Sequence, residues 1–239
     1  MSVYKCLSLA EILSANTYPG RGIVVGMSED KKYAVSAYFI MGRSENSRNR
    51  VFIENGDEVI IHPFDASKVE DPSLIIYSPI RKYENNLIVT NGDQTDTVYD
   101  GLVAGKSFSD ALTARCFEPD APNFTPRISA MLTFADGDFT YKMSILKKNV
   151  GNQECDRFTF DFAAAPGRAR FIHTYMGDGN PIPSFYGEPE QVETADDIDE
   201  FTNTIWESLN EQNKISIYVR YVDLADGSVE ERMINKNQK

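Results

Sequence analysis

Short segments with the composition of β-strands dominate this chain and restrict it to folds built on sheets. They are rich in Val, Ile, Tyr and Phe and are bounded by Gly, Pro, Asn or Asp, as expected of strands that end in turns. In the first half they cover 22–27, 33–41, 57–62, 73–77 and 87–90. In the second half they cover 127–134, 139–146, 157–162, 169–175, 215–222 and 228–234. Asp136-Gly137 and Asp226-Gly227 lie between such runs, which predicts two antiparallel hairpins.

Helical signals are few. Ser107 or Ser109 can cap a helix that runs to about Cys116, because a serine hydroxyl accepts one of the free N–H groups at a helix start. A third, shorter helix is predicted over 96–103. Many antiparallel strands with few helices indicate an α+β protein in which helices cover stacked sheets.

The second well-supported helix follows an acidic run at 188–200. Thr194, with Asp197 three residues later, resembles a capping box. An apolar stripe at helical spacing follows it, formed by Ile198, Phe201, Ile205 and Leu209. We interpret the acidic run as a solvated loop that leads into a helix N-terminus, where negative charge is favourable.

The 239 residues are predicted to form a single domain, 1–239, because no repeat and no flexible Gly/Ser linker divides them. Twenty-four Lys and Arg against thirty-six Asp and Glu give a formal charge of −12. This balance argues against nucleic-acid and anionic-membrane binding, which depend on a dominant basic surface. A small anionic ligand held by a few inward-facing arginines is compatible with an acidic exterior.

The sequence also predicts a cytoplasmic protein. Its first residues lack the apolar core of a signal peptide, and no segment approaches the roughly 20 apolar residues that a membrane span needs. Cys6, Cys116 and Cys155 are widely spaced and include no CxxC pair. We therefore expect reduced thiols.

Several common catalytic motifs are missing. Gly20-Arg21-Gly22 followed by Gly26 is not a GxGxxG fingerprint, and no GxxxxGK[ST] loop is present. His62 and His173 are too few for a His-rich metal site and are interpreted as structural residues in strands. No GxSxG elbow accompanies them.

Polar functional groups are instead concentrated at strand ends in the first 130 residues, where sites are usually built. The segments are Arg43-Ser44 with Arg48-Asn49-Arg50, Tyr77 with Arg81, 91–97, and Glu118 through Thr125 to Arg127, and the alternative for Arg48 and Arg50 is that they only solubilise a loop. Arginine offers a planar fork for phosphate oxygens, and Asn and Thr side chains can complete an anion or ribose site. Each segment alone is equally well explained as a capped turn with a surface arginine, but the four together favour a phosphorylated small ligand.

Five short motifs occur in a fixed order. They are Gly20-Arg21 with Val25-Gly26, Arg43-Ser44 with Arg48, Tyr77 with Ile80-Arg81, Asn91-Gly92 with Thr95-Asp96-Thr97, and Thr125-Pro126-Arg127-Ile128. In this order the chain resembles the archaeal-type inosine monophosphate (IMP) cyclohydrolase family. The resemblance covers roughly 18–135, with 1–17 as an N-terminal extension, and the second half does not align motif by motif.

The resemblance implies a four-layer α-β-β-α sandwich of two mainly antiparallel sheets, like that of the N-terminal nucleophile (Ntn) hydrolases but without their autoprocessing. It also implies the last step of purine biosynthesis, in which 5-formamidoimidazole-4-carboxamide ribonucleotide closes to IMP with loss of water. That chemistry needs no metal and no redox cofactor. Expected partners are a small purine ribonucleotide, but no nucleic acid and no membrane, and a homo-oligomer is left open.

The candidate site residues lie within or near the matched motifs and have side chains that suit this chemistry. The expected catalytic residues are Tyr77, Arg43 and Arg127 as donors to the developing oxyanion and Glu118 as proton acceptor. The expected substrate-binding residues are Arg21, Arg43, Ser44, Arg48, Arg81, Asn91, Gly92, Thr95, Asp96 and Thr125.

Two other functions stay open. An Ntn-type amidohydrolase is suggested by Ser2, which becomes N-terminal if Met1 is removed. Such a nucleophile normally begins a core strand, however, whereas Ser2 lies about twenty residues before the first strong strand. The other alternative is a purine-nucleotide-binding paralogue without catalysis.

Overall fold

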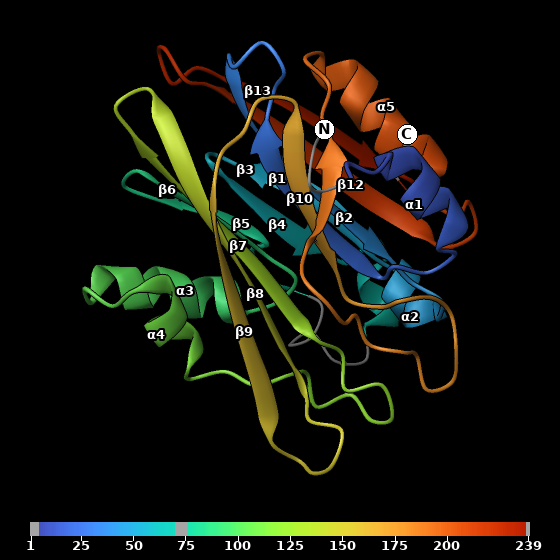
Figure 1. Cartoon of the computed structure of the whole chain (residues 1–239). Coiled ribbons are helices and arrows are strands. Elements are labelled where there is room, and N and C mark those ends of the chain that lie inside the picture. The colour runs from blue at the N-terminus through green and yellow to red at the C-terminus, as the bar shows by residue number, and fades with distance from the viewer. Residues whose placement is uncertain (1–4, 70–75, 238–239) are drawn as a thin grey trace.

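Two antiparallel sheets form the body of the protein (Figure 1). The computed structural model describes residues 5–69 and 76–237. The smaller sheet has the strand order β11-β10-β1-β2-β12-β13. Its strands are β1 (Arg21–Met27), β2 (Tyr33–Met41), β10 (Arg168–His173), β11 (Glu190–Glu193), β12 (Lys214–Asp223) and β13 (Val229–Asn235).

The larger sheet follows chain order from β3 to β9. Its strands are β3 (Val51–Asn55), β4 (Glu58–His62), β5 (Ile80–Tyr83), β6 (Asn86–Thr90), β7 (Arg127–Ala135), β8 (Asp138–Lys148) and β9 (Cys155–Ala163). The two sheets stack through a shared apolar core that includes Ile23 and Tyr38 from one sheet and Val89, Ala130 and Met143 from the other. Burial of this apolar surface drives the two sheets to stack.

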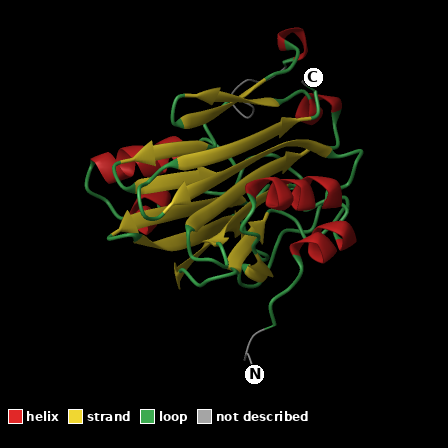
Figure 2. Ribbon diagram, turned by 90° about the horizontal axis from the view of Figure 1, so that it is seen from above, coloured by secondary structure: helices red, strands yellow, loops and turns green. Residues whose placement is uncertain are grey.

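Helices cover both outer faces (Figure 2). On the smaller sheet, α1 (Leu9–Ala15) and α5 (Ile198–Ser208) pack against strand residues such as Val24 and Phe171. On the larger sheet, α3 (Gln94–Val103) and α4 (Phe108–Leu112) pack against Ile88 and Met131. A short helix α2 (Glu45–Arg48) and a 3-10 turn (Ala66–Lys68) lie in connections. The predicted α+β class with stacked antiparallel sheets is confirmed.

The hairpin and helix predictions can be compared with the structure one by one. Asp136 and Gly137 both have positive φ angles, 51° and 76°, as a type I′ turn requires, and they join β7 to β8. Gly227, with φ of 75°, lies in the turn between β12 and β13. The helix capped by Ser107 is α4, which ends at Leu112 before the expected limit. The third helix is α3, and it begins two residues earlier than predicted.

The capping-box prediction for α5 was wrong. Asp197 is itself the N-cap, and its side chain accepts the N–H of Glu200 at 2.8 Å. The Thr194 hydroxyl instead donates to the carbonyl of Met27 at 2.8 Å. The apolar stripe of α5 is buried as predicted. The acidic run is not only a loop, because β11 forms inside it and pairs with β10.

Several elements had no clear sequence signal. The helices α1 and α2 and the short strands β3, β5 and β11 were not predicted. Each is seven residues or fewer, too short for a periodic pattern to stand out. For the predicted strand 73–77, residues 73–75 lie outside the described residues, and Ile76 and Tyr77 are not in a strand.

One end of the sandwich brings the polar segments together. In the smaller sheet β1 begins there, opposite the end of β2 and the end of β10, through the pairs Arg21↔Ile40 and Gly22↔His173. In the larger sheet β6 ends there, beside the start of β7 at Thr90↔Ser129. Antiparallel pairing therefore places loops from distant parts of the sequence at the same edge.

Candidate active site

Charged, phenolic and hydroxyl side chains gather between the two sheets at this end, and all of them are buried except Arg21, which is half-buried. We call them the buried charge cluster, which consists of Arg21, Tyr38, Arg50, Tyr77, Glu118, Thr125, Arg127 and Tyr175. Glu118 and Arg127 are each only 7% exposed, and Arg50 is 2% exposed. Buried charges are rare unless they are paired or serve a ligand.

Two arginines give the cluster its cationic character. Burial lowers the pKa of the Arg21 guanidinium, but Glu118 and the phenols around it outweigh burial and raise it overall. Burial, together with the charge of Arg21, lowers the pKa of Arg50. Arg50 donates through Nε to the carbonyl of Ser47 at 2.8 Å, whereas Nε of Arg21 is buried without a hydrogen-bond partner. Two guanidinium groups thus share one buried region.

Glu118 is the carboxylate that faces these arginines. Burial raises its pKa, and Arg21 and Arg127 oppose the shift only in part. The loop that carries it is held in shape, because the N–H of Glu118 donates to the Thr125 carbonyl at 2.9 Å. Thr125 in turn bonds Asp120 through its hydroxyl and its N–H, and its hydroxyl lies 2.5 Å from that of Tyr175. A positioned carboxyl with a raised pKa is suited to proton transfer.

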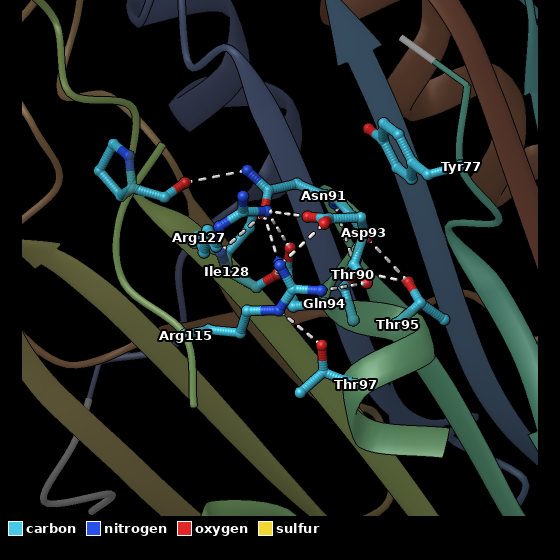
Figure 3. Close-up of polar contacts among 12 residues, drawn as sticks. Tyr77, Thr90, Asn91, Asp93, Gln94, Thr95, Thr97, Arg115, Arg127 and Ile128 are labelled. Carbon is cyan, nitrogen blue, oxygen red and sulfur yellow. Dashed lines mark hydrogen bonds and ion pairs between the residues drawn. The ribbon is translucent and has the colours of Figure 1, made fainter. Parts of the chain in front are cut away.

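Asn91 joins the end of β6 to the start of β7 (Figure 3). Its Nδ2 donates to the carbonyl of Pro126 at 2.9 Å. Its Oδ1 accepts from the N–H of Ile128 at 2.8 Å and from Nε2 of Gln94 at 2.9 Å. Asn91 is fully buried. Its bonds hold the two strand ends in register beside the cluster.

Arg127 is held by the turn that follows β6 (Figure 3). Its Nη1 donates to Oε1 of Gln94 and to Oδ1 of Asp93, both at 2.7 Å. Asp93 also pairs with Arg115 at 2.8 Å. Gly92 lies directly beneath this contact, because a Cβ there would come within 2.5 Å of Arg127 Nη1. The Nε of Arg127 is buried without a partner.

Thr95 supports the same turn from below. Its hydroxyl lies 2.6 Å from that of Thr90 and donates to the carbonyl of Gly92 at 3.1 Å. Both threonines are fully buried. In this structure Thr95 thus shapes the turn that presents Gly92 and Arg127.

Tyr77 contributes a hydroxyl at the other side of the cluster. That hydroxyl is 3.0 Å from the hydroxyl of Tyr38 on β2. Burial raises the pKa of Tyr77, while Arg21 and Arg50 act in the opposite direction. A neutral phenol beside two guanidinium groups can donate a hydrogen bond to a ligand oxygen.

Arg43 lies at the rim and not inside the cluster. Its guanidinium stands 5.3 Å from the ring centroid of Tyr18, which stacks on Tyr175. It donates to the carbonyl of Gly179 at 2.8 Å and forms an ion pair with Asp178. Arg43 is therefore connected to the cluster through aromatic rings.

Ser44 and Arg48 stabilise the connection after β2. The Ser44 hydroxyl accepts the N–H of Ser47 at 3.1 Å, as the N-cap of α2. Arg48 donates to the carbonyl of Gly42 and to Oδ1 of Asn213, both at 3.0 Å.

Arg81 and Asp96 form a separate group. Arg81 donates to Glu58 at 2.8 Å and to Asp96 at 2.9 Å, and it lies 3.8 Å from the ring centroid of Tyr99. These partners belong to β4 and α3, and none of them is a member of the buried charge cluster. The structure does not bring Arg81 and Asp96 together with Arg21 and Glu118.

Sequence reasoning missed three members of the cluster. Arg50 was treated with Arg48 as part of a loop, but it lies immediately before β3 and is buried. Tyr38 and Tyr175 lie in or beside predicted strands, where nothing in the sequence distinguishes them from ordinary core tyrosines.

A cavity of about 310 Å³ lies at the opposite end of the sandwich, between the β5–β6, β7–β8 and β12–β13 turns. Its lining includes Glu84, Phe134, Asp136 and Leu224 and contains no member of the buried charge cluster. Among residues 5–69 and 76–237, no group of three or more His, Cys, Asp or Glu side chains is arranged to hold a metal ion. None of the described helices is long and apolar enough to cross a membrane.

Fold and site define an α+β protein with a buried, arginine-rich cluster between stacked sheets. A family model described as IMP cyclohydrolase-like protein matches residues 18–227. The chain belongs to this family, and the resemblance noted in the sequence is confirmed. The match extends well beyond the aligned region 18–135 into the second half.

Three archaeal relatives carry the name IMP cyclohydrolase. The protein of Methanothrix thermoacetophila is 34% identical over 48% of this chain and 58% of its own length. That of Methanococcus aeolicus is 32% identical over 59% of this chain and 77% of its own length. That of Methanocella arvoryzae is 32% identical over 48% of this chain and 58% of its own length. The matched region thus covers little more than half the length of the relatives from Methanothrix thermoacetophila and Methanocella arvoryzae.

Proposed function

We propose that this protein is an IMP cyclohydrolase, which closes 5-formamidoimidazole-4-carboxamide ribonucleotide to IMP with loss of water. The observation that carries the proposal is the buried charge cluster, in which three arginines surround one carboxyl of raised pKa. Of the three, Arg127 also pairs with Asp93, so the positive charge in excess belongs to Arg21 and Arg50. This charge favours an anionic ligand, because an anion would compensate the cost of burying it. Membership of the IMP cyclohydrolase-like family supports the choice of ligand.

The reaction requires the protein mainly to position the substrate and to transfer protons. The carboxamide nitrogen attacks the formyl carbon and loses a proton, and the formyl oxygen becomes an oxyanion that takes up a proton. This hydroxyl then leaves as water with the proton of the formamide nitrogen, which forms a double bond to the former formyl carbon. Bringing the two ends of the substrate together is itself a large part of such catalysis. Donors aimed at the oxyanion supply much of the rest.

We assign Glu118 to proton transfer and Arg127 and Tyr77 to the formyl oxygen. The Nε of Arg127 offers a donor that has no partner among the residues that the structure describes. Arg21 and Arg50 are assigned to an anionic or carbonyl group of the ligand, with Thr125 beside them and Arg43 at the rim. Asn91, Gly92 and Thr95 are assigned to holding this arrangement. Direct substrate binding by Ser44, Arg48, Arg81 and Asp96 stays a prediction, which the ion pair between Arg81 and Asp96 disfavours for those two residues.

The finer fold assignment is also a proposal. Two stacked antiparallel sheets with helices on both outer faces support an Ntn-hydrolase-like α-β-β-α sandwich within a single domain, with 1–17 as an extension. Cys6, Cys116 and Cys155 are free thiols, which suits the reducing cytoplasm.

A turnover assay with the formamido nucleotide tests the function directly. We expect the purified chain to form IMP, and Glu118→Gln to retain folding while losing most of the activity. Tight nucleotide binding without turnover would favour the non-catalytic paralogue. The amidohydrolase alternative rests on Ser2, which lies outside the described residues. The intact mass, which shows whether Met1 is removed, tests it.

A further inference from the structure

The strand β9 leaves one edge of the larger sheet without a neighbouring strand in the part of the chain that the structure describes. It is nine residues long and pairs with β8 in continuous register from Thr140↔Ala163 to Lys148↔Cys155 (Figure 1). The N–H and C=O groups along such a regular edge are a template for another strand.

Two other edge strands are covered within the chain. At β3, the side chain of Asn235 donates to the carbonyl of Phe52 at 2.9 Å and accepts its N–H at 2.8 Å. At β11, the N–H of Leu7 donates to the Gln191 carbonyl at 2.9 Å, and the N–H of Glu193 donates to the Leu7 carbonyl at 3.2 Å. Natural sheets usually protect their edges in such ways.

Most side chains of β9 beyond its first two residues are exposed or half-buried. The helical layer rests on β6, β7 and β8 through Ile88, Met131 and Leu146, and it contacts the start of β9 at Cys155. Beyond that contact, Arg157, Thr159 and Asp161 are exposed. On the face toward the other sheet, Phe158 is 43% exposed. Phe160 and Phe162 next to it are half-buried.

The order of residues in β9 is complementary to itself. In an antiparallel pair of two copies centred on Thr159, Arg157 lies opposite Asp161 of the second copy, and Phe158 lies opposite its Phe160. Opposite charges and aromatic pairs are the cross-strand neighbours that stabilise sheets. The edge strand β13 lacks this property, because a two-fold centred on Arg232 or on Glu231 sets like charges against each other.

We propose that two copies of this chain pair along β9 in an isologous dimer, so that the larger sheet continues from one copy into the next. We identify the partner of the β9 edge as a second copy of this chain. Two-fold pairing of β9 with itself sets opposite charges against each other and aromatic rings against each other. One strand pair with its neighbouring side chains is a small interface. We therefore expect a dissociation constant on the order of micromolar.

Sedimentation velocity of the full chain over a concentration series measures this equilibrium. Arg157→Glu should raise the dissociation constant about tenfold or more, because it turns two attractive cross-strand pairs into repulsive ones. Adding Asp161→Lys to the same chain should restore it. Arg157 also donates to the Arg115 carbonyl within its own chain at 2.6 Å. The double variant does not restore that bond, so recovery reports on pairing between copies.

Two control variants separate pairing from other effects. Glu54→Lys reverses an exposed charge on β3, the opposite edge strand, and should leave the dissociation constant unchanged. Lys142→Gln removes the partner of Asp161 within the chain and should also leave the dimer intact. Thermal unfolding at low concentration shows whether each variant is folded.

Hydrogen exchange of the unaltered protein supplies a test that needs no variant. Amide protection of β9 should rise with protein concentration, while that of β3 should stay constant. A chain that is monomeric at all concentrations, a dimer that Arg157→Glu does not weaken, or β9 protection independent of concentration would each overturn the proposal.

Discussion

At the scale of single residues, the buried charge cluster combines groups whose protonation is set by their surroundings. Burial favours the neutral form of Glu118 and of Tyr77, and the arginines beside them oppose it. Glu118 is therefore suited to exchanging a proton, and Tyr77 keeps its own proton and can donate a hydrogen bond. These two roles lead to different experimental signatures.

Tyr77→Phe removes one hydroxyl and keeps the ring. If the hydroxyl supports the developing oxyanion, kcat should fall about a hundredfold with little change in product affinity. The matched control is Tyr38→Phe, which removes the other hydroxyl of the same hydrogen bond. A lower melting temperature with nearly unchanged kcat in the Tyr77 variant would mean that the hydroxyl only satisfies its neighbour in the core.

Glu118→Gln should change how stability depends on pH. Because the pKa of Glu118 is raised in the folded state, the folded protein binds more protons than the unfolded chain between the ordinary glutamate pKa and the raised one. The contribution of Glu118 to the free energy of unfolding is fully present below the ordinary glutamate pKa. It is lost as the pH rises through the raised pKa of the folded state. Urea unfolding over a pH series should therefore show the unaltered protein losing stability relative to Glu118→Gln as the pH rises. Parallel profiles would contradict the raised pKa.

At the scale of elements, the site depends on how the turn after β6 meets the start of β7. Asn91 replaces ladder hydrogen bonds where the two strands separate, and Gly92 leaves space for the guanidinium of Arg127. The neighbouring contacts of Gln94, Asp93 and Thr95 hold that space open. A small change in the turn should thus move Arg127 without unfolding the sheet.

Gly92→Ala tests this dependence. The new Cβ would lie about 2.5 Å from Arg127 Nη1 and 2.6 Å from Gln94 Oε1, both at the far ends of flexible side chains. We expect kcat/KM to fall tenfold or more, since small displacements of positioned groups are costly in rate, with a loss of stability below about 1 kcal/mol. Gly177→Ala is the control, because a Cβ there meets nothing within 4 Å. Equal activity in both variants would remove Gly92 from the site.

At the scale of the whole molecule, the charge distribution is uneven. The chain carries a formal charge of −12, yet its buried cluster contains three arginines around one carboxyl. An acidic exterior with a cationic interior would slow the approach of an anionic ligand but hold it once bound. The arginines inside the sandwich and those outside it should therefore differ in their effect on nucleotide binding.

The variants Arg50→Lys and Arg81→Lys compare an arginine inside the sandwich with one outside it, because both carry the same substitution. Lysine keeps the charge but loses the planar fork. We expect Arg50→Lys to weaken binding of IMP about tenfold and binding of inosine much less. Arg81→Lys should change both only slightly, because Arg81 is occupied by Glu58 and Asp96. Calorimetric titration of both ligands measures these effects, and equal weakening of IMP and inosine by Arg50→Lys would remove it from the anion site.

Local sequence signals were enough to predict the longer strands, the tight hairpin at Asp136-Gly137 and the buried stripe of α5. These features follow from local periodicity and turn chemistry, which act over a few residues. The sequence also indicated the family, through short motifs in order. The motif residues nevertheless separate in space, because Arg21, Tyr77 and Arg127 belong to the cluster while Arg81 and Asp96 do not.

Which arginines face inward depends on how the two sheets pack against each other. Arg48 and Arg50 are two residues apart and chemically identical, yet Arg48 lies on a surface connection and Arg50 is buried beside Arg21. Their different burial depends on the point at which the chain enters β3. It also depends on which side chains of the smaller sheet lie opposite that point. The cluster combines groups from both sheets, so its composition and its pKa shifts depend on stacking, a long-range packing event that no local pattern encodes.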